Sequence, residues 1–258
     1  MIHFKLKLLL VLFLKLTHGT ESHYLPIPRN QENLYDYSYL VQIWIVDRDF
    51  DFCSGAFITQ KHVITSASCL IDLIDYPEDF GDDPYKFRAT DFLSSTNFSI
   101  SKLSVYPQYV YPYLHNNIAI LELEKRANVQ PIPLNFEPLS ATSLCDNVFW
   151  NRYVQKNNSL VISSTIYPVS IKKCTNVSMP LMETYRYGMI CGELVFKNPN
   201  TTWEPHVDTP LVCHGALSGF FLLFEEDVDS YLFTDLQYYL PWIMKTTISL
   251  DLSQILAP

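Results

Sequence analysis

Short segments rich in valine, isoleucine, phenylalanine, tyrosine and threonine recur along this 258-residue chain and constrain its fold more than any other feature. Clusters of proline and asparagine separate these segments, and no long stretch keeps the 3.6-residue period of an amphipathic helix. Short strands at this spacing are typical of an all-β sandwich or of a pair of barrels. The segments are residues 39–46, 56–59, 63–68, 98–105, 118–123, 160–166, 189–196 and 219–224.

One segment near the C-terminus has the pattern of a helix. It runs from Thr234 to about Ile248, with Asp235 early and Lys245 late, as the helix dipole favours. Pro241 near the first turn of such a helix is tolerable. We therefore expect one helix after the last strand, and few helices elsewhere.

The N-terminus predicts secretion. Lys5 and Lys7 precede an apolar run over residues 8–14, and small residues follow at Thr17 and Gly19. This order of charged, apolar and small residues is that of a signal peptide, predicted over residues 1–19. A transmembrane helix is the competing interpretation, but the apolar run is short and Lys15 interrupts it.

Cysteine content and charge narrow the function classes. Six cysteines in a secreted chain predict three disulfides. The sequence has no Cys-x-x-Cys pair, so the cysteines do not suggest a zinc site. Removing the predicted signal peptide, which has three lysines and no acidic residue, takes the formal charge from −9 to −12. An acidic chain without a basic run argues against binding to nucleic acid and to anionic membranes.

Four Asn-x-Ser/Thr triplets follow the predicted signal peptide, and in a secreted chain such triplets are acceptors for N-linked glycans. We expect at least two of the four to carry sugar. The asparagines are Asn97, Asn157, Asn176 and Asn200.

Five short segments have distinctive local patterns, in this order along the chain: residues 53–58, 63–69, 117–121, 205–213 and 239–243. Together they resemble patterns of the trypsin-like (S1) serine proteases. The first four are similar to Cys-Gly-Gly-Ser-Leu-Ile, Val-Leu-Thr-Ala-Ala-His-Cys, Asp-Ile-Ala-Leu-Leu and Gly-Asp-Ser-Gly-Gly-Pro-Leu-Val-Cys in the family, and the fifth is similar to its C-terminal helix.

The resemblance implies a single trypsin-like domain made of two six-stranded antiparallel β-barrels with a C-terminal helix. It also implies the disulfides Cys53–Cys69, Cys145–Cys213 and Cys174–Cys191, although six cysteines permit fifteen pairings and spacing alone selects none. The expected boundaries are 1–19 for the signal peptide, 20–258 for the domain, about 35–130 and 141–258 for the barrels, and about 126–140 for a proline-containing linker.

The family's chemistry needs a serine nucleophile, a histidine base and an aspartate that orients the histidine. The resemblance places Val207, Ser68 and Asn117 at these three positions. Valine has no atom that attacks a carbonyl, and a serine hydroxyl is a very poor base near neutrality. The sequence therefore predicts a protein that is not an active serine endopeptidase.

Two further departures support this prediction. Pro205 stands where the oxyanion hole needs a backbone N–H, and proline has none. His206 stands where active relatives have the aspartate that pairs with the new N-terminus after activation. The pocket-wall residues of the family map to Leu222, Leu223 and Phe224, and Phe224 would occupy space that a substrate side chain needs.

Other arrangements of reactive groups remain open. A hydrolase with relocated catalytic groups, or a metal site, could use His62, His115, His206 and Asp208, although several groups would need to converge afresh. A tyrosine-rich segment just before Asn117 corresponds to a loop that borders the substrate cleft in active relatives. Its residues Tyr106, Tyr109, Tyr111 and Tyr113 are a candidate recognition loop, with packing between strands as the alternative role.

The resemblance thus implies a secreted, non-catalytic homologue that acts by protein binding and needs no cofactor or metal. Its partner would be a secreted protein, such as an active protease or its substrate, in an extracellular protease network or in an immune or reproductive secretion. The alternatives are an active serine-type endopeptidase, another hydrolase with relocated groups, and a carrier or structural component of a secreted fluid.

Overall fold

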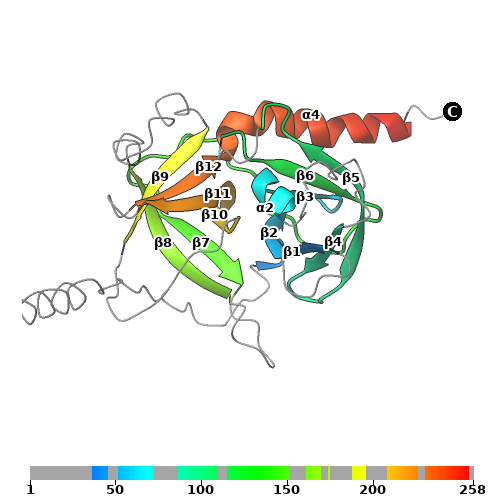
Figure 1. Cartoon of the computed structure of the whole chain (residues 1–258), viewed down its shortest axis with the longest axis horizontal. Helices are drawn as coiled ribbons and strands as arrows, with labels where there is room; N and C mark the ends of the chain where they lie inside the picture. Colours follow the sequence, from blue (N-terminus) through cyan, green and yellow to red (C-terminus); the bar gives the residue numbers. More distant parts are fainter. Residues whose placement is uncertain are drawn as a thin grey trace, which may run out of the picture.

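The structure is a computed structural model, and it describes residues 37–45, 52–72, 87–109, 115–150, 161–169, 174, 188–195, 208–225 and 230–255. These residues form two closed antiparallel barrels of six strands each, which stand side by side in Figure 1. The predicted all-β class, the two barrels and the C-terminal helix are confirmed.

The N-terminal barrel has the strand order β1-β2-β3-β6-β5-β4. In β4, the buried Phe87, Ala89 and Asp91 alternate with the half-buried Arg88 and Thr90, which is the two-residue period of a strand with one face on a core. The strands are β1 (Leu40–Ile45), β2 (Phe52–Phe57), β3 (His62–Thr65), β4 (Phe87–Asp91), β5 (Asn97–Val105) and β6 (Ala119–Leu123).

The C-terminal barrel has the strand order β10-β11-β12-β9-β8-β7, and β7 closes it by pairing with β10. Its interior includes Phe221, Tyr231 and Phe233, and the ring of Phe221 packs against the other two rings. The strands are β7 (Cys145–Trp150), β8 (Val161–Val169), β9 (Met189–Leu194), β10 (Pro210–Cys213), β11 (Ala216–Glu225) and β12 (Ser230–Asp235).

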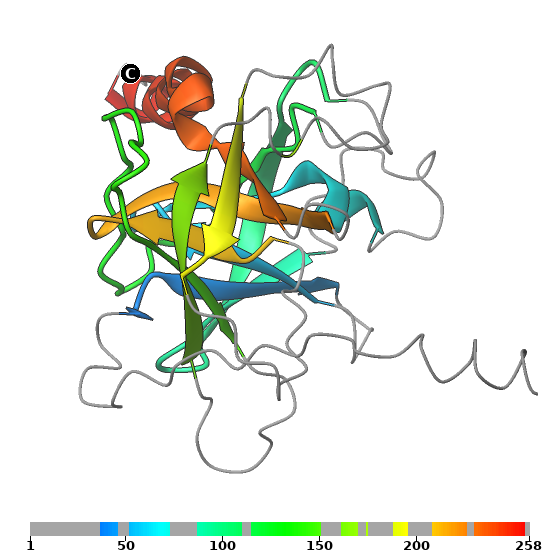
Figure 2. The same cartoon turned by 90° about the vertical axis from the view of Figure 1, so that its left-hand side faces the viewer.

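Two helices carry residues of the candidate site. The short helix α2 (Ala67–Asp72) follows β3 and lies between the barrels in Figure 1. The long helix α4 (Leu236–Ile255) follows β12 and runs above the N-terminal barrel, and Figure 2 shows it nearly end-on at one edge of the molecule. Helix α2 was not expected from the sequence, where residues 63–68 were predicted to form a strand.

The predicted bounds of the terminal helix were wrong at both ends. Asp235 precedes the helix as its N-cap, because its Oδ1 accepts a hydrogen bond from the Gln237 N–H at 3.0 Å. The helix continues to Ile255, so Lys245 lies in its middle and not in its last turn. Pro241 lies in the second turn of α4, beyond the first-turn position at which proline is best tolerated.

One apolar cluster joins the barrels to α4. It combines Ile64 and Ile120 of the N-terminal barrel, Phe220 of the C-terminal barrel and Tyr239 of the helix, all nearly inaccessible to solvent. Burial of large apolar and aromatic side chains is the main favourable contribution to folding. The two barrels and the helix are therefore held together by a shared core.

The predicted linker lies between β6 and β7 and contacts both barrels. The Ile132 N–H donates to the Phe57 carbonyl of the first barrel at 2.9 Å. The Leu217 N–H of the second barrel donates to the Pro133 carbonyl at 2.8 Å, and Leu134 forms a parallel bridge with Leu217. Although the linker contains prolines, its remaining backbone N–H and C=O groups form hydrogen bonds with both barrels.

All three implied disulfides are confirmed: Cys53–Cys69, Cys145–Cys213 and Cys174–Cys191. The first joins β2 to α2, the second joins the adjacent strands β7 and β10, and the third reaches β9. Within the described residues, no helix has the length and apolar character needed to cross a bilayer.

Candidate functional site

Ser68 and Asn117 are in direct contact with each other, at the positions that the resemblance assigned to a catalytic base and its orienting partner. Ser68 is the second residue of α2, and Asn117 lies just before β6. The Ser68 backbone N–H donates to Asn117 Oδ1 at 2.7 Å, and Asn117 Nδ2 donates to Ser68 Oγ at 2.8 Å. Ser68 is 6 % exposed and Asn117 is 1 % exposed, so both hydrogen bonds are shielded from water.

The side chain of Asn117 also caps helix α2. The first N–H groups of a helix have no partner within the helix, and Asn117 supplies an acceptor for one of them from a residue 49 positions away. Because that N–H requires an oxygen, the amide orientation follows from hydrogen-bond chemistry. The contact therefore fixes the start of α2 against β6.

The chemistry of this pair differs from that of imidazole and carboxylate. In the triad mechanism, the carboxylate accepts a hydrogen bond from the imidazole and stabilises its positive charge. Here the Asn117 amide donates to the Ser68 hydroxyl, so the side-chain hydrogen bond runs in the opposite direction and neither group is charged. Neither group is suited to take a proton from a hydroxyl nucleophile near neutral pH.

Val207, Pro205 and His206 lie outside the described residues, which resume at Asp208. Asp208 has φ of +76° and is 1 % exposed. The family motif has glycine at this position, and aspartate is among the non-glycine residues that best tolerate a left-handed backbone. The Asp208 N–H donates to the Phe221 carbonyl at 3.0 Å, which ties this turn to β11.

The carboxylate of Asp208 faces the Cys53–Cys69 disulfide. Its oxygen and the two sulfur atoms lie within 4.8 Å of one another. Sulfur atoms in a disulfide are not thiolates, so this group does not offer the thiolate ligands that bind metals. A relocated catalytic site or a metal site that includes Asp208 would have to use a buried carboxylate next to this disulfide.

Two histidines of the alternative catalytic or metal sites, His62 and His115, are among the described residues. His62, in β3, is 6 % exposed, and its Nδ1 lies 2.8 Å from Thr59 Oγ1. The same hydroxyl accepts the His62 backbone N–H at 2.9 Å, so His62 belongs to a tight turn before the strand. Desolvation lowers the pKa of His115, which favours a neutral imidazole at physiological pH.

Asn116 connects Asn117 to helix α4. It has φ of +58°, its Nδ2 donates to the Gln108 carbonyl at 3.1 Å, and its Oδ1 accepts from the Tyr239 hydroxyl at 3.3 Å. The Tyr239 ring also meets Tyr106 edge to face, with ring centroids 5.1 Å apart. The helix therefore braces the loop on which Asn117 lies.

Tyr239 predicts a pH dependence of stability. Burial raises its pKa above the ordinary value of about 10. Below pH 10 the phenol is protonated in both the folded and the unfolded chain, but at higher pH the unfolded chain ionises first, so stability falls as pH rises. Between pH 8 and pH 11, this one group should cost about 1.4 kcal/mol. Urea unfolding of the wild type and Tyr239→Phe at both pH values should show that the variant lacks this loss.

The control for this prediction is Tyr238→Phe, because Tyr238 is 47 % exposed and neighbours Tyr239 on the same helix. This variant should keep the full pH dependence of the wild type. Equal pH dependence in the wild type and Tyr239→Phe would contradict the assignment to Tyr239.

The candidate recognition loop is only partly described. Tyr106 packs against Tyr239 and Trp242 of α4, and Tyr109 packs against the core of the N-terminal barrel. Both residues thus pack within the protein, Tyr106 against a helix and Tyr109 against the barrel core. Tyr111 and Tyr113 lie outside the described residues, so recognition by this loop stays a prediction.

Of the predicted glycosylation sites and pocket-wall residues, some lie within the described part of the chain and some outside it. Asn97 is exposed at the start of β5, and its Oδ1 accepts from Thr90 Oγ1 at 2.6 Å. Leu222 is buried in a cluster with Met189 and Cys191, and Leu223 packs against the edge of that cluster. The asparagines of the other three triplets lie outside the described residues: Asn157, Asn176 and Asn200.

Two features of the site were missed from sequence. Asn116 next to Asn117 gave no periodic or motif signal, although an Asn-Asn pair before a strand is compatible with a left-handed turn residue. The capping role of Asn117 could not be found, because it joins segments that are distant in sequence.

The family of this chain follows from comparison with known proteins. Residues 29–243 match the model of the protein family described as Trypsin, and the chain belongs to this family. A curated relative is a venom protease of Bombus pensylvanicus, 34% identical over 89 residues. This alignment covers 33% of the chain and 36% of the venom protease, so the chain spans about a third of that relative's length.

Solved structures confirm the trypsin-like fold. Kallikrein-related peptidase 10 in complex with Zn2+ superimposes with a TM-score of 0.61 at 20% identity, over 83% of this chain and 98% of the other. The scabies mite inactivated protease paralogue S-D1 gives a TM-score of 0.61 at 19% identity, over 81% of this chain and 92% of the other.

Proposed function

We propose that this protein is a secreted, non-catalytic member of the trypsin family that acts by binding another secreted protein. The observation that carries the proposal is the Ser68–Asn117 pair, two neutral buried groups hydrogen-bonded to each other at 2.8 Å where the family's mechanism needs a base and its orienting carboxylate. Val207 and Pro205 in the chain's sequence support it further, because they remove the nucleophile and one oxyanion donor.

The buried position of the pair strengthens the argument. Asn117 is 1 % exposed and both of its side-chain heteroatoms are engaged by Ser68, so the amide is not poised to orient a different base. A residual protease mechanism would need a new nucleophile and a new base in this setting. Loss of the nucleophile alone reduces turnover by roughly a millionfold in a related mechanism.

Secretion is supported by three disulfides, which form and persist in oxidising compartments. The exposed Asn97 is positioned to accept a glycan in that compartment. The partner would be an active protease or its substrate, and the protein would act as a regulatory partner or decoy. A scabies mite protein of the same fold is described as an inactivated protease paralogue, so a role without catalysis is compatible with this architecture.

The test is a cleavage assay on the mature glycoprotein from a secretory host. The wild type and Val207→Ser are incubated with a diverse peptide library and with a fluorophosphonate probe, beside active trypsin. We expect no cleavage and no labelling from either protein, because Val207→Ser restores a hydroxyl but leaves Ser68 in place of a base. Products and labelled protein are measured by mass spectrometry.

The outcome that overturns the proposal is cleavage by the wild type that copurifies with the protein through several columns. His206→Ala and Asp208→Ala then separate the alternatives. Loss of that activity in either variant would identify a hydrolase with relocated groups, whereas its persistence would locate the catalytic groups elsewhere in the chain.

A further inference from the structure

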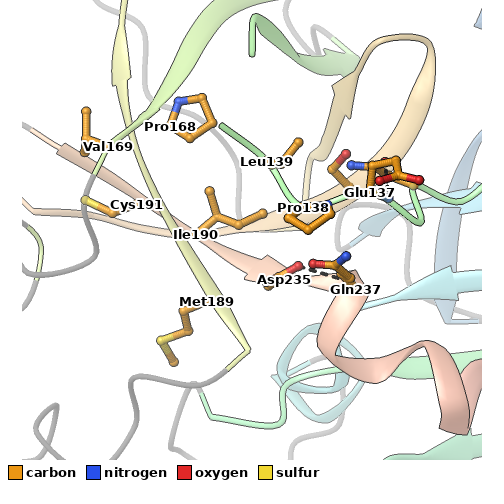
Figure 3. A pocket seen from close by; sticks show the side chains of 12 residues that line it. Glu137, Pro138, Leu139, Pro168, Val169, Met189, Ile190, Cys191, Asp235 and Gln237 are labelled. Carbon is orange, nitrogen blue, oxygen red and sulfur yellow. Dashed lines mark hydrogen bonds between the residues drawn. The ribbon is translucent and has the colours of Figure 1, made fainter. Parts of the chain in front are cut away.

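A cavity lies on the C-terminal barrel, built from residues other than Ser68 and Asn117. It opens between the linker, strands β8, β9 and β11, the end of β12 and the start of α4, and it encloses about 210 Å³. Figure 3 shows Ile190, Leu139 and Pro138 facing one another across it. Cavities for drug-sized ligands occupy about 300–1,000 Å³, so this one fits a single side chain better than a whole metabolite.

The cavity has apolar and polar surface in about equal parts, and its two carboxylates lie away from the apolar residues of β8. Pro168, Val169 and Ile190 contribute apolar surface, and Figure 3 draws Asp235 and Glu137 away from Pro168 and Val169. No lysine, arginine or histidine lines it among the described residues. A small cavity that offers both apolar side chains and carboxylates is complementary to an aliphatic stem that carries a cation.

Asp235 is the more buried of the two carboxylates, and desolvation raises its pKa. A cation placed beside it would compensate for the lost hydration and favour the charged form. One oxygen of Asp235 accepts the Gln237 N–H at the start of α4, and the helix dipole stabilises that carboxylate. Asp235 and Glu137 together still leave the cavity with an excess of negative charge.

An exposed aromatic residue next to the lining residues in sequence favours a protein over a free amine as the ligand. Phe136 lies between the lining residues Asn135 and Glu137 and is 59 % exposed, and its carbonyl accepts from Gln237 Nε2 at 2.9 Å. Exposed aromatic rings are enriched in protein interfaces and also attract cations. Lysine and arginine bury an apolar stem while their charged ends stay near polar groups.

We propose that this cavity binds a lysine or arginine side chain of a secreted protein partner, with the stem against Ile190, Leu139 and Pro138 and the cation beside Asp235 and Glu137. The site is separate from the Ser68–Asn117 pair, so the proposal stands even if the protein proves to be catalytic.

The test follows the methyl signals of the mature glycoprotein labelled with ¹³C-methyl methionine. Met189 lines the cavity, and Met244, which is 46 % exposed on α4, serves as an internal control. The probes are Nα-acetyl-arginine methylamide, Nα-acetyl-lysine methylamide and the neutral Nα-acetyl-norleucine methylamide. Met189→Leu assigns the signal. We expect both cationic probes to shift the Met189 signal in a saturable way, and norleucine to bind at least about fivefold more weakly.

Three variants connect the shift to the carboxylates. Asp235→Asn keeps an oxygen that caps α4, and Glu137→Gln changes an exposed side chain, so both should fold. Each should weaken binding of the cationic probes at least about fivefold, whereas Glu124→Gln, an exposed residue outside the cavity, should not. Equal binding of norleucine, unchanged binding in both cavity variants, or no Met189 shift at millimolar probe would overturn the proposal.

Discussion

Replacing both cysteines of the Cys145–Cys213 disulfide with alanine should lower the free energy of unfolding by about 4 kcal/mol, measured by urea unfolding. The two cysteines are 68 residues apart, and they are directly paired in the ladder that closes the C-terminal barrel. Cross-linking a long loop removes much conformational freedom from the unfolded chain, so its loss favours unfolding. This effect is a large part of the stability of an ordinary domain.

The matched control is the double alanine variant of Cys174 and Cys191. These cysteines are also buried, at 3 % and 1 % exposure, but they are only 17 residues apart. The same chain-entropy argument gives about 3 kcal/mol for this pair, which is about 1 kcal/mol less than for the longer loop. A larger loss for the shorter loop would show that packing around the sulfurs, and not loop closure, sets the difference.

The sequence predicted the fold class from pattern and the barrel pair from resemblance, but it missed four strands. β10 begins with Pro210 and β4 contains Arg88 and Asp91, so neither presents a plain run of β-formers. β12 does contain such a run before the helix cap Asp235, but its Thr234 was assigned to the predicted helix. β7 includes the polar pair Asp146-Asn147. These segments are strands because neighbouring strands supply their hydrogen bonds, which is tertiary context and not local propensity.

The terminal helix shows the opposite error, since the predicted element was real but too short. The helix continues past Ile248 to Ile255, although the sequence there does not show the periodic apolar pattern by which a helix is predicted. No proline or glycine that would end a helix occurs between Ile248 and Pro258. The start was misplaced by two residues, because Asp235 was assigned to the helix when its side chain caps it.

The candidate site was predictable residue by residue but not in its geometry. The resemblance selected Ser68 and Asn117, yet the amide's double role, toward a backbone N–H and toward a hydroxyl, depends on two segments meeting in space. The cavity of Asp235 and Glu137 had no sequence signal at all, because its lining comes from separate segments. Sites assembled from distant segments become visible only once the fold is known.

Replacing Asn117 with alanine should lower the free energy of unfolding by about 2–4 kcal/mol. The substitution leaves the Ser68 N–H without its acceptor at 2.7 Å and Ser68 Oγ without its donor at 2.8 Å, both in a buried setting. Each buried polar group left without a partner costs about 1–3 kcal/mol. Helix α2 also loses the cap that Asn117 supplies from the segment before β6, so hydrogen exchange in the α2 backbone should speed up along with the loss of stability.

The control is Asn135→Ala, because the Asn135 side chain accepts the Glu137 N–H at 3.1 Å in an exposed position. That variant should lose about 1 kcal/mol or less. Ser68→Ala alone and with Asn117→Ala completes a double-mutant cycle, in which direct contact predicts a coupling energy of about 0.5–3 kcal/mol. Additive effects would mean that Asn117 acts through the α2 backbone alone. A strong coupling would show that the hydrogen bond between the two side chains itself stabilises the fold. The two positions would then have a structural role in this protein, whereas the family's mechanism uses the same positions for catalysis.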